Sequence, residues 1–120
     1  MASKVVDIYA LPVRQKDLDA YRLMSRAVGR IFRKHGVTEY REFTAAQPAM
    51  AGAKPFTGGI RLRKGEVLVT AIVGYPSVAA RDRINKALEK DPKLTVLNPD
   101  PPLFDMKRMV VSSFETIIDV

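Results

Sequence analysis

The sequence predicts an α+β domain in which a four-stranded antiparallel sheet carries two helices on one face. Strand-like and helix-like patterns follow one another in the order strand, helix, strand, strand, helix, strand, which is the order of the ferredoxin-like fold. The 120 residues suffice for a single core, so we expect one domain over residues 1–120. Three of the strands are apolar on both faces, and this predicts how the domain assembles.

The first predicted strand runs from Val5 to Val13. One of its faces is apolar except for Asp7, and the other is apolar throughout. Pro12 has no N–H group to donate to a neighbouring strand. We therefore expect either that the strand ends there or that its outer side is unpaired.

A long helix is predicted from Gln15 to His35. Apolar side chains recur along it at steps of three or four residues and form a stripe that faces a core. Gly36 supplies the left-handed residue that commonly ends a helix. Glu39 to Thr44 is the second predicted strand, with Tyr40 and Glu42 alternating against Arg41 and Phe43. A second stripe on the helix is basic and consists of Arg22, Arg26, Arg30, Arg33 and Lys34.

The middle of the chain predicts a long connection, a buried strand and a second helix. The connection from Ala45 to Glu66 lacks periodicity and is punctuated by glycine and proline, so we expect the least ordered internal segment here, with one short helical turn at most. The strand from Val67 to Tyr75 is apolar on both faces. Ser77 is placed to cap the following helix, which the Asp91-Pro92 pair ends.

The C-terminal part predicts an irregular, proline-rich segment from Leu94 to Phe104 and a last strand from Lys107 to Ile118. An antiparallel sheet with helices on one side normally leaves its other face polar. Here the first, third and last strands are apolar on both faces, and the sequence offers no third helix to cover the second one. We therefore predict a homodimer in which two sheets pack face to face, giving a dimeric α/β barrel with a twofold interface.

Composition and charge exclude several classes of function. The chain has no cysteine, which excludes disulfides, thiolate catalysis and cysteine metal sites. No apolar run reaches the roughly 20 residues that cross a bilayer. The N-terminus lacks the features of a secretion signal, so we expect a cytoplasmic protein without membrane contact. The net charge of +7 would attract nucleic acid, but a charge total carries no geometry, and we favour a solvated basic surface.

Several short motifs together resemble a family of small bacterial proteins known as a domain of unknown function, which is similar to the dimeric α/β-barrel superfamily. The motifs are Leu18-Asp19-Ala20-Tyr21-Arg22, His35-Gly36, Glu39-Tyr40, Tyr75-Pro76-Ser77, Arg81-Asp82, Asn85, Asp91-Pro92, Phe104-Asp105, Lys107-Arg108-Met109, Phe114-Glu115 and Asp119. The resemblance covers nearly the whole chain and implies the fold. The wider superfamily includes monooxygenases, haem-degrading enzymes, isomerases and stress proteins, so fold membership does not choose an activity. The haem-degrading relatives use a tryptophan, which this chain lacks.

The candidate site residues lie at predicted ends of helices and strands. His35, the single histidine, is a candidate general acid or base; the alternative, which we favour, is a helix-terminal histidine stabilised by the helix dipole. Arg108 is suited to hold a carboxylate or phosphate, but an ion pair with Asp82 or Asp105 that orders the loop is an equal alternative. We expect Arg81 to bridge to a neighbouring strand or a second subunit.

The predicted pocket is the space between helices and sheet, which both His35 and Arg108 should border. The full set of ligand-binding candidates is His35, Tyr75, Phe104, Asp105 and Arg108, with the two aromatic residues as walls. One histidine with scattered carboxylates matches no metal-ligand spacing, and no phosphate-loop motif is present. We predict neither a metal nor a cofactor.

Three functions remain open from the sequence. The first is a site for a small anionic or aromatic metabolite between helices and sheet, with or without catalysis. The second is a structural or stress-related dimer without a ligand. The third, which we rank last, is nucleic-acid binding through the basic stripe, because the central strand has no aromatic residue in its middle on which bases could stack.

Overall fold

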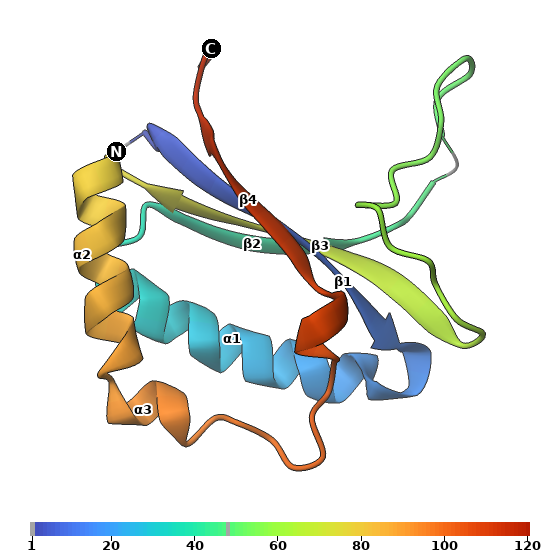
Figure 1. The fold of residues 1–120 in the computed structure, drawn as a ribbon, viewed down its shortest axis with the longest axis horizontal. Helices are drawn as coiled ribbons and strands as arrows, with labels where there is room; N and C mark the ends of the chain where they lie inside the picture. The colour runs from blue at the N-terminus through green and yellow to red at the C-terminus, as the bar shows by residue number, and fades with distance from the viewer. Residues whose placement is uncertain (1, 48) are drawn as a thin grey trace.

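The computed structural model describes residues 2–47 and 49–120 and has the predicted ferredoxin-like α+β fold (Figure 1). All strand pairs are antiparallel, and the strand order across the sheet is β2-β3-β1-β4. The four strands are β1 (Val5–Arg14), β2 (Glu39–Thr44), β3 (Glu66–Tyr75) and β4 (Val110–Glu115). The bounds of β2 are those predicted, whereas β1 and β3 each gain one residue because Arg14 and Glu66 pair with each other.

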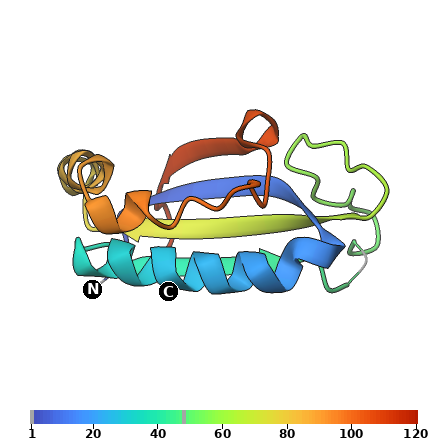
Figure 2. The same cartoon turned by 90° about the horizontal axis from the view of Figure 1, so that it is seen from below.

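Helices cover one face of the sheet. They are α1 (Leu18–Lys34), α2 (Val78–Glu89) and the short α3 (Pro92–Thr95). Figure 2 shows α1 lying along the strands, whereas α2 is seen end-on and therefore crosses the direction of α1 at one end of the sheet. Within the described residues, no helix combines the length and apolarity needed to span a bilayer.

Two predicted helix boundaries need correction. Residues Gln15–Asp17 form a 3-10 turn, so α1 begins at Leu18. The segment after α2, predicted as wholly irregular, begins with the turn of α3, because the Asp91 side chain accepts a hydrogen bond from the Lys93 N–H and caps it. The predicted residues at the end of α1 and at the start of α2 are confirmed. Gly36 is left-handed with φ 108°, and Ser77 accepts a hydrogen bond from the Ala80 N–H at 3.0 Å.

The last strand is shorter than predicted, and Pro12 accounts for where it begins. The Lys4 carbonyl accepts a hydrogen bond from Thr116 at 2.9 Å, whereas Gln15 donates to Gly65 beside β3 at 2.7 Å. Because bonding directions alternate along a strand, the even-numbered residues of β1 face β4, and Pro12 is one of them. It has no N–H to donate, and the β1–β4 pairing stops at Ala10. The side of β1 that faces β4 is thus unpaired at Pro12. This is the second of the two alternatives expected from the sequence.

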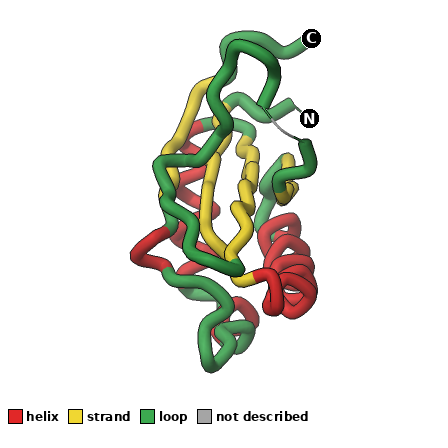
Figure 3. The backbone as a smooth tube through the Cα atoms, turned by 90° about the vertical axis from the view of Figure 1, so that its right-hand side faces the viewer, coloured by secondary structure: helices red, strands yellow, loops and turns green. Residues whose placement is uncertain are grey.

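The connection between β2 and β3 forms no helix or strand among its described residues, and it projects from the end of the sheet opposite α2 (Figures 1 and 3). Part of it lies on the sheet face that carries no helix. A Cβ atom on Gly58, which has φ +63°, would come within 2.4 Å of the Ala10 Cβ. Only glycine allows this close approach. The loop thus covers one end of the outer face of the sheet. From the sequence we expected only a second subunit to cover this face.

The rest of that outer face is apolar and partly exposed. The strand register places Val6 beside Phe114, and Ile8 beside Ile72, on this side of the sheet. Phe114 and Val110 are 51% and 41% exposed. Every residue of β4 is exposed, although the loop comes close to Val110 at Gly58.

The end of the sheet beneath α2 is closed by a tight core. Tyr75 is 0% exposed and packs with Ile84 and Leu88 of α2. Asp7, the one charged residue on the inner face of β1, is 1% exposed and accepts a hydrogen bond from the Arg81 Nε at 2.8 Å. Arg81 therefore bridges α2 to a neighbouring strand, which is the first of the two roles expected for it.

Candidate functional site

A cavity of about 1160 Å³ lies between α1, the inner face of the sheet and the segment that connects α3 to β4. It exists because α2 stands at the end of the sheet, so that this connecting segment, and not a second long helix, faces α1 (Figure 2). Its apolar walls include Leu11, Met24, Val28, Phe32, Leu103, Phe104 and Met109.

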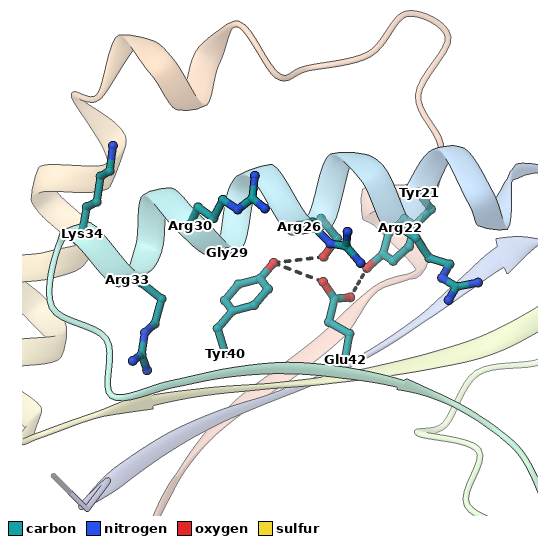
Figure 4. Close-up of a pocket in the computed structure, with 10 residues that line it drawn as sticks. Tyr21, Arg22, Arg26, Gly29, Arg30, Arg33, Lys34, Tyr40 and Glu42 are labelled. Atoms are coloured by element: carbon teal, nitrogen blue, oxygen red, sulfur yellow. Dashed lines mark hydrogen bonds between the residues drawn. The ribbon is translucent and has the colours of Figure 1, made fainter.

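Four polar side chains converge on one wall of this cavity: Tyr21, Ser25, Tyr40 and Glu42. The Glu42 carboxylate accepts hydrogen bonds from the hydroxyl groups of Tyr21 and Tyr40, the latter at 3.1 Å. Ser25 Oγ lies 3.2 Å from the Tyr40 hydroxyl. Figure 4 shows Tyr21, Tyr40 and Glu42 meeting between α1 and the edge strand β2. We call these four residues the tyrosine–glutamate cluster.

Local sequence explains why the cluster forms. Tyr21, Ser25 and Gly29 are spaced by four residues, which places them on one face of α1, and all three are buried. Tyr40 and Glu42 alternate onto the inner face of β2. A Cβ atom on Gly29 would lie 2.7 Å from the Tyr40 ring, so the small side chains of α1 are what allow the tyrosine to approach the helix.

Burial controls the electrostatics of the cluster. Loss of solvent raises the pKa of Glu42, and the hydrogen bonds from the two tyrosines oppose this rise without cancelling it. Burial, followed by the neighbouring Glu42 charge, raises the pKa of both Tyr21 and Tyr40. A carboxyl group whose pKa is moved toward neutrality at the wall of a cavity is suited to accept or donate a proton.

A second, smaller cavity of about 660 Å³ lies on the other side of the cluster, along the gap between α1 and β2. The same four polar residues form its floor. Its rim is the basic stripe that the sequence showed on α1: Arg22, Arg26, Arg30, Arg33 and Lys34. We call this second cavity the basic groove (Figure 4).

Two of the residues singled out from sequence are engaged at the closed end of the sheet. His35 follows the last residue of α1, and its Nε2 lies 2.7 Å from Asp91 Oδ2. Tyr75 is fully buried, and its hydroxyl donates to Asn85 Oδ1 at 3.2 Å. Neither His35 nor Tyr75 belongs to the walls of the two cavities.

The other three candidates border the larger cavity. Phe104 packs edge-on against Tyr21, with ring centroids 6.0 Å apart. Asp105 accepts a hydrogen bond from the Lys107 N–H at 3.0 Å and so caps a 3-10 turn. Arg108 is held by Glu66, at 2.5 and 2.8 Å, and donates to a loop carbonyl. The carboxylate partner of Arg108 is therefore Glu66, and not Asp82 or Asp105 as considered from the sequence.

The structure does not bring His35 and Arg108 together. His35 lies at the C-terminal end of α1, which is about 25 Å long. Arg108 binds Glu66, and Glu66 pairs with Arg14 just before the other end of that helix. In the described part of the chain, no group of three or more His, Cys, Asp or Glu side chains is arranged to hold a metal ion.

Sequence reasoning missed Tyr21, Ser25 and Glu42, although a signal for them was present. Tyr40 and Glu42 share one face of a strand whose other residues face solvent or the outer side. A carboxylate on an inward face must find hydrogen-bond donors. Tyrosine and serine one helical turn apart, on the stripe that faces the sheet, are the donors that this requirement would have selected.

Comparisons with known sequences show which family the chain belongs to. Residues 4–106 match the family described as "Protein of unknown function (DUF1428)". The uncharacterized protein YbaA of Escherichia coli K12 is 30% identical over 116 residues, which cover 97% of this chain and 98% of YbaA. The chain therefore belongs to the DUF1428 family.

Solved structures show the same fold at low sequence identity. A protein from an uncultured marine organism, described as a dimeric ferredoxin-like protein, has a TM-score of 0.57 and 12% identity, with 99% of this chain and all of the other covered. A nipsnap family protein with unknown function from Agrobacterium tumefaciens has a TM-score of 0.58 and 16% identity, with 93% of this chain and 86% of the other covered.

Proposed function

We propose that this member of the DUF1428 family is a homodimer that binds a small aromatic metabolite in the cavity between α1 and the sheet. The observation that carries the proposal is the tyrosine–glutamate cluster on the wall of an otherwise mostly apolar cavity of about 1160 Å³. A few polar groups that converge on an apolar pocket are typical of small-molecule sites. The apolar walls take up the ring, and Glu42 with its tyrosines contacts a polar substituent.

Glu42 gives this site a chemical capacity as well as an affinity. Its carboxyl group exchanges a proton more readily near neutral pH than an exposed glutamate does, because burial raises its pKa. Two tyrosine hydroxyls fix its orientation. The proposed role of Glu42 is therefore to accept a proton from, or return it to, a hydroxyl or an acidic C–H group of the bound molecule.

The proposed dimer is supported by the outer face of the sheet. Val6, Ile8, Ile72 and Phe114 lie on it together, and a second copy would remove them from water. The neighbour described as a dimeric ferredoxin-like protein is consistent with this assembly. A specific interface buries about 1,000 Å² or more in total.

Light scattering at micromolar concentration tests the dimer. We expect twice the monomer mass for the native chain and the monomer mass for Phe114→Arg, because an arginine placed in the interface would be buried without a partner. A native chain that is monodisperse as a monomer would contradict the dimer.

A thermal-shift screen with simple phenols and aromatic acids tests the ligand site. We expect stabilisation of the native protein by at least one aromatic probe and a weaker shift for Glu42→Gln and Tyr40→Phe. Asp82→Asn, which removes an exposed carboxylate outside both cavities, is the matched control and should retain the native shift. If the dimer persists but no probe in a broad panel stabilises it, the alternative of a structural dimer without a ligand is favoured.

A further inference from the structure

The basic groove carries an unbalanced charge that the aromatic site does not use. Its five cationic side chains all come from exposed positions of α1. Among residues 2–47 and 49–120, no carboxylate lies within 4.0 Å of Arg26, Arg30, Arg33 or Lys34. Arg22 lies 3.8 Å from Asp19, but both side chains are largely exposed, and such pairs contribute little.

The spacing of these cations matches an extended anion better than a single one. Arg22, Arg26 and Arg30 are one helical turn apart, so that neighbouring side chains start about 6 Å from each other. The distance along the helix from Arg22 to Arg33 is about 16 Å. Figure 4 shows Arg22 and Arg33 on either side of the Tyr40 and Glu42 side chains, so the two guanidinium groups flank the floor of the groove.

We propose that the basic groove binds a small molecule that carries two or more phosphate groups. Guanidinium groups bind phosphate oxygens in bidentate fashion, and several of them in a row fit several phosphates in a row. The volume of about 660 Å³ lies within the usual range for small-molecule sites. This site is separate from the aromatic cavity and shares with it only the wall that the tyrosine–glutamate cluster forms.

A single-stranded nucleic acid fits the groove less well. Proteins that bind single strands stack the bases on exposed aromatic side chains. The two aromatic residues of the groove, Tyr21 and Tyr40, are turned inward to Glu42, and the Tyr40 ring is in contact with Gly29. The groove thus offers cations for phosphates but no platform for bases.

Isothermal titration with inorganic tripolyphosphate at moderate salt tests the proposal. We expect binding by the native chain and a loss of at least about tenfold in affinity for the Arg26→Gln/Arg30→Gln variant, since two phosphate contacts are removed. Both residues are exposed, so the fold should be kept, and this is checked by thermal unfolding. The matched control is Arg83→Gln/Lys86→Gln on α2, which removes the same charge outside both cavities and should bind within about twofold of native.

Each alternative gives a distinct result. Absence of tripolyphosphate binding, or equal losses in the two double variants, would overturn the proposal, the latter because binding would depend only on net charge. Citrate that binds as tightly would replace polyphosphate by polycarboxylate as the ligand class. An eight-nucleotide single-stranded RNA that binds more tightly than tripolyphosphate would make the groove a nucleic-acid site. Phe104 lines the larger cavity and not the basic groove, so Phe104→Ala reports on the aromatic site alone, and a failure of one site is distinguishable from a failure of the other.

Discussion

Two carboxylates on the inner face of the sheet have opposite surroundings. Asp7 on β1 is 1% exposed and is bound by the guanidinium of Arg81 at 2.8 Å. Glu42 on β2 is bound by two neutral tyrosine hydroxyls and lies beside two cavities. Both are acids facing helices, yet only one has a cation bonded to it.

The difference separates a structural group from an available one. The charge of Asp7 is balanced within the core that joins α2 to the sheet, so this acid has no capacity left for a ligand. The charge of Glu42 is stabilised by hydrogen bonds from hydroxyl groups alone, and these oppose the effect of burial without cancelling it. A half-buried acid that lacks a bonded cation and borders a cavity is the stronger candidate for function.

The largest effect should follow from removing the cation beside Asp7. Arg81→Gln leaves a buried carboxylate without its charged partner, and we expect a loss of about 3 kcal/mol in the free energy of unfolding. Urea denaturation measures this loss. The double variant Asp7→Asn/Arg81→Gln should recover part of it, and a single variant as stable as the native chain would show that the pair does not hold α2 in place.

The next effect comes from ionisation of the tyrosines that lie near Asp7 and near Glu42. Burial raises the pKa of all four, Tyr9, Tyr21, Tyr40 and Tyr75. Because each folded pKa lies above that of the unfolded chain, stability is full below about pH 10 and is lost as the pH rises further. We expect tyrosinate absorbance to appear only together with the loss of circular dichroism. A gradual rise near pH 10 in the folded protein would contradict this.

A smaller effect should follow from crowding the tyrosine–glutamate cluster. Gly29→Ala adds a methyl group 2.7 Å from the Tyr40 ring, which costs about 2 kcal/mol as overpacking and is partly offset by about 1 kcal/mol of helix propensity. We expect a net loss of about 1 kcal/mol and weaker binding of aromatic probes. Ala27→Gly on the same helix changes propensity without touching Tyr40, and it should leave probe binding unchanged.

The smallest effect on stability should come from Glu42 itself. Burial raises the folded pKa of Glu42, so the folded state keeps this proton to higher pH than the unfolded chain does. As the pH rises from the unfolded to the folded pKa of Glu42, the free energy of unfolding of the native protein therefore falls. Glu42→Gln lacks this loss. Urea titrations should show the variant gaining on the native protein from pH 4 to pH 8, and parallel curves would mean that the carboxyl group is not desolvated.

Patterns along the chain predicted the fold well because each element carries its own signal. The two faces of β3 and the serine cap of α2 are local features, and both are confirmed. The ends of β4 are not local: the strand begins after Met109 because β1 offers no donor at Pro12, and pairing stops at Glu115 because β1 begins at Val5. The predicted strand was too long because apolar residues continue after Glu115. An alternating pattern alone does not show that a partner strand is present.

The candidate site was harder to predict, because it depends on which elements face each other. Phe104, Asp105 and Arg108, which lie in one short stretch of sequence, all border the larger cavity, and their contact with a ligand stays a prediction. His35 was selected for its chemistry, but its position at the end of α1 puts it against Asp91. Glu42 drew no attention as a glutamate among others, and only the packing of α1 over β2 gives it two tyrosine neighbours.

Pro12 lines the larger cavity and limits how far β4 pairs with β1. If Pro12 were a valine, the register would place Arg108 opposite it, and β4 could extend toward β1 by two more residues. Arg108 would then leave Glu66, and Met109 would be drawn from the cavity wall into the sheet. A covalent constraint on a single backbone nitrogen thus decides which residues before β4 join the sheet and which stay at the cavity wall.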